Sequence, residues 1–425
     1  MKNPKTTLLS RRDFLKLTGT ASLGLALSAC GLTPVPTATP RLTSTLIPTN
    51  TNTPTLTSTP SPTPEPPTLR SVGERIGILF GTTFDETGDS NGDWYNPKFQ
   101  EAVRIHFSIV MPEASFLPPH YGYQKQMNAR ARKNRTRISD AGQILFIQPG
   151  LWSEDRLSLK NSSREQIIDF AEKRVRHLFQ FVEKVSTKAK PTYMYLLNEI
   201  FWETDYKGGD ESDWFNAEEN PYFAVWGNRQ IIEAYLMYTR IAKEMGLEIG
   251  KDYRLVYNDY NTYRPNAKVR KAAYEVDRAR TEIAKLQGIS PKDVLIDVGM
   301  QCRFWYSRRP WFAIPPPTEE QLRQVVRTFK QVADRVHFTE ATVIGANSQQ
   351  QIMDTLRMLN RVAFEEGVAS TTYWKAMLPL GVKDPDIKST GPTAEPLGLF
   401  DSQARTTDAY DFVVRDLLEM SAAKK

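Results

Sequence analysis

Thr192 to Glu199 reads T-Y-M-Y-L-L-N-E, an apolar run that ends in an amide and an acid. Nearly continuous apolar residues over this length are typical of a parallel strand buried on both faces. An acid at the end of such a strand either stabilises the fold or takes part in chemistry. Glu203 follows four residues later, beyond the expected strand end, and the pattern there predicts a loop residue paired with a basic neighbour.

Seven further apolar runs accompany this one along the chain. They are residues 75–82, 106–112, 143–150, 253–260, 293–301, 335–342 and 370–376. Amphipathic helical patterns separate most of them, and eight strand–helix alternations predict a (β/α)8 TIM barrel. A doubly wound open sheet has the same periodicity and stays open as an alternative.

The helical patterns carry their own boundary signals. Ser162 to Glu165 is predicted to form a capping box before the apolar stripe of residues 168–182. Pro317 and Thr318 followed by two glutamates are typical of a helix start. Residues 228–242 and 347–364 are further amphipathic helices in this interpretation.

Polar residues gather at the carboxyl ends of the runs. They are Glu113, Gln148, Asn198, Glu199, Asn258, Asp259, Gln301, Glu340, Trp374 and Lys375. In a TIM barrel these ends meet at one face, where active sites lie. Like charges crowded together cost stability unless they are paired or used, so the pattern indicates a functional site.

Glu199 ends the fourth run and Glu340 ends the seventh, so a barrel would bring them toward each other across its mouth. Glycoside hydrolases typically use two carboxyl groups that face each other across the scissile bond. One protonates the leaving oxygen and the other attacks the anomeric carbon. The alternative is that both glutamates form salt bridges at strand ends. Their joint position favours catalysis.

The chain resembles glycoside hydrolase family 10, the retaining endo-β-1,4-xylanases, along nearly all of residues 69–414. The similar segments are F-S-I-V-M-P-E (107–113), L-L-N-E (196–199), V-Y-N-D-Y-N (256–261), I-D-V-G-M-Q (296–301), H-F-T-E-A (337–341), G-L-F-D (398–401) and D-A-Y (408–410). The opening strand L-R-S-V-G-E-R-I-G-I-L-F-G-T (69–82) is similar as well. Their order and spacing together carry the resemblance.

The resemblance implies that Glu199 is the acid/base and Glu340 the nucleophile. It implies Asn198 and Gln301 as contacts around the reacting sugar, and Glu113 and Trp152 as further sugar contacts. Aromatic platforms stack on sugar rings, and Trp152, Trp305 and Trp374 are the candidates, with ordinary packing as the alternative. Gln148 and Asn258, at strand ends, complete the predicted substrate-binding set.

Several positions depart from the family's pattern. Ala114 and Leu117 stand where an Asn and a Lys are usual, Gln148 and Ser153 replace two His, and Cys302-Arg303 replaces Ser-His. A second Trp expected after Trp374 is absent from the region of residues 380–382. These changes put the sugar preference in doubt while both glutamates persist.

Arg303 is the most informative of these departures. A planar guanidinium could recognise the carboxylate of an acidic sugar such as a uronic acid side group. The alternative is that Arg303 pairs with Glu203 or another local acid. Cys302 beside it is predicted to be a small buried filler.

The N-terminal residues predict export. Residues 1–30 combine a twin-arginine pattern at Arg11-Arg12, a short apolar run and a lipobox-like end at Cys30, the predicted lipidation site. Residues 31–68 are rich in Thr, Pro and Ser and predict an extended linker. Residues 69–425 form the predicted barrel domain, and the chain is expected to be an exported cell-surface or periplasmic lipoprotein. An ordinary signal peptide is the alternative.

Charge and cysteine content narrow the expected partners. Residues 1–29 carry five basic residues and one acid, so four of the six net positive charges lie there and no nucleic-acid partner is expected. With Cys30 lipidated, Cys302 has no partner for an intrachain disulfide. The histidines show no metal-ligand spacing, so neither metal nor cofactor is expected.

These features predict a monomer that binds a polysaccharide and meets the membrane only through its lipid. The predicted function is a retaining hydrolase that cleaves internal β-1,4-xylosidic bonds of xylan. A related barrel hydrolase acting on another β-glycan, and a glycan-binding lipoprotein without turnover, are the alternatives. The retained pair of glutamates argues against a glycan-binding lipoprotein without turnover.

Overall fold

The protein is represented by a computed structural model, and nine parallel strands make up its sheet. It describes residues 65–84, 96–112, 124–182, 190–201, 220–306, 316–344, 346, 348–374, 398–401 and 403–423; at 124–130, 305 and 344 only the backbone is described. The strands are β1 (Leu79–Phe84), β2 (Ile109–Pro112), β3 (Ile144–Ile147), β4 (Leu151–Trp152), β5 (Thr192–Asn198), β6 (Tyr253–Tyr260), β7 (Ile296–Trp305), β8 (Val336–Ile344) and β9 (Ser370–Tyr373).

The sheet closes on itself. Its order is β3-β2-β1-β9-β8-β7-β6-β5-β4, and an additional pairing of β3 with β5 joins the two sides. Every pairing between these strands is parallel. The predicted TIM barrel is therefore confirmed, and the doubly wound open sheet is excluded.

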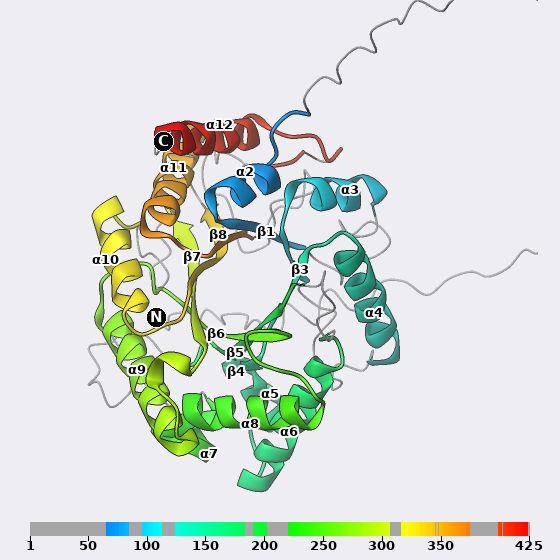
Figure 1. Cartoon of the computed structure of the whole chain (residues 1–425), viewed down its shortest axis with the longest axis vertical. Helices are drawn as coiled ribbons and strands as arrows, with labels where there is room; N and C mark the ends of the chain where they lie inside the picture. The colour runs from blue at the N-terminus through cyan, green and yellow to red at the C-terminus, as the bar shows by residue number, and fades with distance from the viewer. Residues whose placement is uncertain are drawn as a thin grey trace, which may run out of the picture. The chain divides into compact units, whose positions relative to one another are not determined.

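Helices surround this ring of strands, as Figure 1 shows. They are α2 (Leu69–Ile76), α3 (Pro97–His106), α4 (Gln124–Asp140), α5 (Arg156–Leu159), α6 (Arg164–Phe179), α7 (Pro221–Trp226), α8 (Gln230–Glu244), α9 (Ala267–Gln287), α10 (Glu319–Lys330), α11 (Gln349–Glu366) and α12 (Asp408–Ala423), with short 3₁₀ turns η3 (Ser153–Asp155), η5 (Gly227–Arg229) and η6 (Pro291–Asp293). No helix in the described part of the chain has the length and apolar character needed to cross a bilayer.

Each of the eight predicted runs overlaps a strand, and β4 is an extra short one. Several boundaries differ from the prediction, among them the end of α2 and the start of α6. Residues 75–76 end helix α2, and Gly77, at φ 79°, separates them from β1. The capping box of α6 lies one residue later than expected: the Ser163 hydroxyl accepts from the Gln166 N–H, and the Gln166 side chain accepts from the Ser163 N–H. The predicted start at Thr318 is confirmed as the N-cap of α10.

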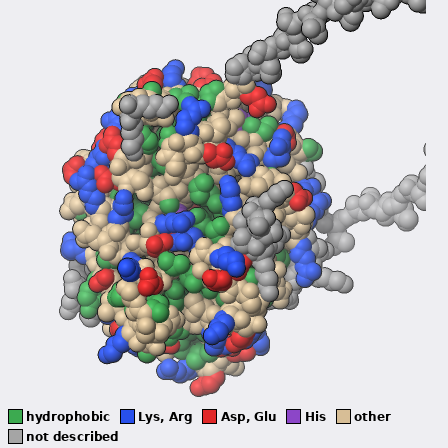
Figure 2. Space-filling view, viewed as in Figure 1, with side chains coloured by type: hydrophobic (Ala, Val, Ile, Leu, Met, Phe, Trp, Pro, Cys, Tyr) green, Lys and Arg blue, Asp and Glu red, His purple; other side chains and the backbone are tan. Residues whose placement is uncertain are grey.

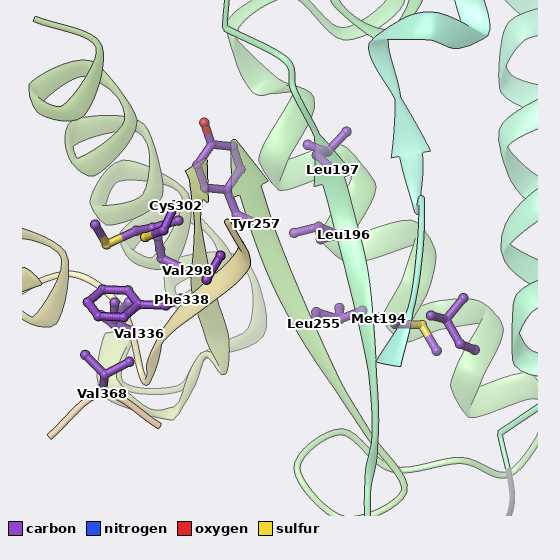
Figure 3. Close-up of a cluster of buried hydrophobic side chains, with 14 of the residues drawn as sticks. Met194, Leu196, Leu197, Leu255, Tyr257, Val298, Cys302, Val336, Phe338 and Val368 are labelled. Carbon is purple, nitrogen blue, oxygen red and sulfur yellow. The ribbon is translucent and has the colours of Figure 1, made fainter. Parts of the chain in front are cut away.

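Apolar side chains alternate along the central strands and fill the space between strands and helices. Met194, Leu255, Val298 and Phe338 belong to this layer, and Figure 3 shows them on their strands. Cys302 is fully buried in the same layer, which confirms it as a small filler. A smaller cluster, which includes Phe146, Tyr195 and Val256, packs separately.

The polar residues between these apolar ones bond to partners on other barrel strands. Arg254 donates to both oxygens of Asp297 over 2.7 Å. His337 contacts the same carboxylate over 3.3 Å and the Ser370 hydroxyl over 2.8 Å. Because side chains alternate between the faces of a strand, the next residues of this face along β6, β7 and β8 lead toward the carboxyl ends of the strands. On this face the polar group of Arg254, Asp297 and His337 is followed by an apolar layer that includes Val256, and then by Asn258, Gln301 and Thr339 near the carboxyl ends.

Candidate active site

Glu199 follows β5 directly and has a left-handed backbone, with φ 55°. Both of its carboxylate oxygens accept hydrogen bonds from side chains of other strands. Trp152 donates its indole N–H to Oε2 over 2.9 Å, and Gln301 donates its amide to Oε1 over 2.9 Å. The carboxylate is thus held between β4 and β7.

Glu340 lies within β8 and is also left-handed, with φ 54°. Only 3% of the residue is exposed. Arg303 donates to Oε2 over 2.5 Å, while Oε1 accepts from the Tyr195 hydroxyl over 3.3 Å and from the Asn258 amide over 3.5 Å. Burial raises the pKa of Glu340, the charge of Arg303 opposes that rise, and the charge of Glu199 adds to it.

A network of amides joins the two glutamates. Asn198 Oδ1 accepts from Asn258 over 2.7 Å and from Gln301 over 3.4 Å, and these same two amides reach Glu340 and Glu199. Thr339 donates to Asn258 Oδ1 over 2.6 Å and fixes that amide. The two carboxylates therefore share one hydrogen-bonded framework.

Gly299 on β7 makes room for this framework. A Cβ at position 299 would lie 2.4 Å from Asn258 Oδ1 and 3.1 Å from the Thr339 methyl carbon. Any side chain there would displace Asn258, because contacts this short do not occur between real Cβ atoms and their neighbours. The small residue thus belongs to the site although it has no functional group.

Trp152 is held by a buried charged cluster behind it. Asp155 Oδ2 accepts from the Trp152 backbone N–H over 3.0 Å and from the Tyr222 hydroxyl over 2.6 Å. Arg174 forms a salt bridge with Asp155, and both side chains are almost fully buried. The indole N–H that reaches Glu199 is therefore aimed from a fixed backbone.

Arg303 lies between a carboxylate and an aromatic face. Its Cζ is 4.1 Å from the centre of the Trp374 ring, within the range of a cation–π interaction. The guanidinium pairs with a local acid, as one of the two sequence hypotheses expected, and that acid is Glu340. Figure 2 shows basic, acidic and apolar side chains side by side in the middle of one face of the molecule.

The sequence profile of glycosyl hydrolase family 10 matches residues 151–416. The chain belongs to glycosyl hydrolase family 10. No curated protein sequence matches it significantly.

Among solved structures, xylanase 10B from Thermotoga maritima is similar, with a TM-score of 0.61 and 16% identity over 84% of this chain and 99% of that one. The endo-1,4-beta-xylanase XylE from Penicillium canescens gives a TM-score of 0.60 and 15% identity over 83% and 98%. Xylanase 10B from Thermotoga petrophila, in complex with xylobiose, gives 0.61 and 15% over 84% and 99%. At these identities the neighbours establish the shared fold, and the chain is a divergent member of the family.

The structure of this family 10 member brings most predicted site residues together. Glu199, Glu340, Asn198, Trp152, Asn258, Gln301, Arg303 and Trp374 form one connected set of contacts. Gln148 lies buried at the end of β3, and among the described residues no hydrogen bond joins it to either glutamate. Cys30, Glu113, Glu203, Lys375 and the side chain of Trp305 lie outside the described residues.

The sequence analysis missed the residues that support the site, among them Tyr195, Thr339, Asp155 and Gly299. A weak signal existed for Tyr195, because strand alternation places it on the same face as Tyr193, and a buried tyrosine hydroxyl usually finds a polar partner. Thr339 immediately precedes Glu340 and looks like ordinary strand composition. Asp155 acts through the backbone of Trp152, which no side-chain pattern indicates.

Proposed function

We propose that this chain is a retaining glycoside hydrolase that cleaves internal β-1,4-xylosidic bonds of xylan by double displacement. Glu340 is the nucleophile and Glu199 the acid/base. Membership of glycosyl hydrolase family 10 supports the reaction class. Similar structures named as xylanases, one of them in complex with xylobiose, support the substrate.

One observation carries the proposal: two carboxylates from barrel strands three apart in the ring share a single framework of amides. Structural salt bridges at strand ends would give each glutamate its own basic partner. Glu199 instead accepts only from neutral N–H donors in the contacts described, and the Glu340 side chain is buried beside the one basic group. Neutral donors suit an acid/base that must exchange a proton, and the positive charge of Arg303 opposes the rise that burial gives to the Glu340 pKa and so favours the ionised nucleophile.

In the first step an oxygen of Glu340 bonds to the anomeric carbon while the glycosidic bond breaks. The bonding electron pair leaves with the departing oxygen, which takes a proton from Glu199. In the second step Glu199 takes a proton from water, whose oxygen attacks the anomeric carbon. The bond to Glu340 breaks and its electron pair returns to the carboxylate, so configuration is retained.

In this proposal Asn198 orients the reacting sugar. Its Oδ1 is occupied by Asn258 and Gln301, which leaves the NH₂ of the same amide as a donor toward the 2-hydroxyl. Hydrogen bonds to this hydroxyl strengthen in the transition state of glycoside hydrolysis. Asn198 therefore contributes to rate as well as to binding.

Release of reducing ends from xylan, compared with other β-glucans, tests the proposal. We expect release from xylan by the intact protein and none by Glu340→Ala. Glu320→Ala is the matched control, since that glutamate is largely exposed on α10. Release from another β-glycan instead of xylan refutes the substrate, and binding without release from any of them refutes the enzyme. Undiminished activity of Glu340→Ala refutes the nucleophile.

We also propose that the barrel works outside the cytoplasm as a monomer, tethered through a lipid on Cys30 and lifted by residues 31–68. The arginine pair, the apolar run and the Thr/Pro/Ser-rich composition support this. Metabolic labelling with a tagged fatty acid, compared with Cys30→Ala, checks it. Equal labelling of both proteins would exclude Cys30 as the lipid site.

A further inference from the structure

Arg303 is the one fully charged group that contacts the Glu340 carboxylate in the described part of the chain. It reaches Oε2 over 2.5 Å from β7 and rests on the Trp374 ring at 4.1 Å. The partners of Oε1 are the neutral Tyr195 and Asn258, at the longer distances of 3.3 and 3.5 Å. Among the contacts described, the strongest partner of the buried Glu340 carboxylate is therefore an ion pair with the partly exposed Arg303.

We propose that Arg303 is a catalytic residue that sets the balance between the two steps of the reaction: it slows attack by Glu340 and speeds its departure. This inference rests on the proposed double displacement. It concerns a residue that stands where the family usually has histidine, so it is a property of this chain.

The chemistry follows from the charge that Glu340 carries in each state. Before the first step Glu340 is an anion paired with Arg303, and after it Glu340 is a neutral ester whose oxygens attract the guanidinium much less. The first step therefore gives up the ion pair, and the second step restores it. A hydrogen bond between two charged groups is about twice as strong as a neutral one, so this difference is substantial.

The ratio of the two rate constants isolates this effect. The transition states of both steps have a partly bonded carboxylate and a positively charged sugar, so Arg303 acts on both in a similar way. The ratio of glycosylation to deglycosylation then reports the stability of the ester relative to the paired carboxylate. Removing Arg303 should raise this ratio roughly tenfold to a hundredfold, the value of one hydrogen bond to a charged group.

The pH dependence of the first step gives a second readout. The charged and titratable groups that face Glu340, among those described, are Arg303 from β7, Tyr195 from β5 and Glu199 directly after β5. Without Arg303, the pKa of Glu340 is still raised by burial and by the Glu199 charge and still lowered by the Tyr195 hydrogen bond, but the opposing positive charge is lost. The acid limb of the first step should then move to higher pH, and rate ratios should be compared on the plateau above it.

The experiment measures both steps with 2,4-dinitrophenyl β-xylobioside, a substrate with an activated leaving group. Stopped-flow release of dinitrophenolate gives the first rate constant, steady-state turnover gives the second, and intact mass reports the xylobiosyl adduct. We expect Arg303→Gln to show a larger burst, a higher rate ratio and more adduct than the wild type. Arg303→Lys keeps the positive charge but loses the planar guanidinium that rests on Trp374, so its ratio should lie between those of the wild type and Arg303→Gln.

Arg405→Gln is the matched control, because Arg405 is exposed and pairs with Asp401 in a loop. Should Arg303→Gln fail to fold, Arg303→Met repeats the test, since its unbranched side chain can rest on Trp374. If the ratio of the glycosylation to the deglycosylation rate constant stays unchanged or falls in Arg303→Gln, the inference is overturned. It is also overturned if this ratio changes in Arg303→Lys by as much as in Arg303→Gln. A wild-type protein that cleaves neither xylan nor the xylobioside refutes the proposed function, and this inference falls with it.

Discussion

Replacing Trp152 with phenylalanine keeps a flat apolar ring but removes the indole N–H that donates to Glu199 Oε2 over 2.9 Å. The backbone of residue 152 should stay in place, because its N–H bonds to Asp155 whatever the side chain. Glu199 then keeps only the Gln301 amide as a described partner of its carboxylate. The variant therefore tests whether a positioned Glu199 is needed for proton transfer.

The expected loss in rate follows from the strength of the one hydrogen bond that Trp152→Phe removes. A hydrogen bond to a charged group contributes about 1.5–3 kcal/mol, which corresponds to roughly a tenfold to hundredfold loss in rate. The loss should appear only where the leaving oxygen needs a proton. A phenyl glycoside has a basic leaving oxygen and depends on the acid, whereas a 2,4-dinitrophenyl glycoside departs as a stable anion.

The assay compares kcat/KM of Trp152→Phe and wild type on phenyl and 2,4-dinitrophenyl β-xylobiosides. Any lost stacking of the Trp152 ring on a sugar would weaken both substrates equally, so the ratio between them cancels it. We expect the tenfold to hundredfold loss on the phenyl substrate alone. Tyr274→Phe is the control, since it also removes one polar group from an aromatic side chain and Tyr274 is 60% exposed on α9. An equal loss on both substrates, or no loss on either, refutes the reasoning.

Two further substitutions test the framework, each by the free energy of unfolding in urea. Gly150→Ala places a Cβ 1.6 Å from the Tyr195 carbonyl oxygen, so the backbone must shift, at a cost of about 1–3 kcal/mol or more together with lost activity as Trp152 moves. Asp297→Asn should cost about 3–5 kcal/mol at pH 7, because it breaks a buried pair with Arg254. Burial opposes ionisation of Asp297, but the Arg254 and His337 bonds outweigh it and lower its pKa. Ionised Asp297 therefore stabilises the folded protein at any pH above the pKa of an unfolded-chain Asp, about 3.9, and this stabilisation is lost as the pH falls through the lower pKa of the folded state. The free energy of unfolding should consequently fall more in the wild type than in the variant between about pH 5 and pH 2.

Each of these two predictions has a clear contrary result. Wild-type stability and activity in Gly150→Ala would show that β4 and β5 can move apart without affecting the site. Parallel pH–stability curves for Asp297→Asn and the wild type would show that the Asp297 pKa is the same in the folded and unfolded chain.

The barrel was predictable because parallel strands that are buried on both faces have nearly continuous apolar sequences. Even the short run at residues 370–376, with little apolar content, contains β9. Strand β4 was not predictable, since two residues after Gly150 make no pattern, and its pairing with β5 depends on a glycine that lets the backbones approach. The capping box of α6 was misplaced by one residue because Ser162 and Ser163 are both good N-caps, and only the structure shows which one is used.

The hydrogen-bond partners of the site residues depend on the register between neighbouring strands, and the apolar periodicity of the sequence carries no information about that register. Gln301 and Arg303 lie two apart on β7 and so face the same side, and the sequence could place both at the mouth. Their partners differ because the β7–β8 register shifts between them: Gln301 lies opposite Thr339, while Arg303 lies opposite Thr342. Arg303 thereby reaches Glu340, a pairing between residues 37 apart that the sequence analysis expected only as some local acid.

The same register shift explains how Glu340 comes to face the interior at all. In a regular strand Glu340 would share the face of Phe338, which packs in the outer apolar layer, while Thr339 contacts Asn258 inside. The shift in β8 and the left-handed φ of 54° turn the carboxylate to the same side as Thr339. A left-handed non-glycine residue costs about 1–3 kcal/mol, and Glu199 carries the same feature. Strain at both carboxylates, and at just two other non-glycine positions in the described chain, fits residues selected for reaction rather than for stability.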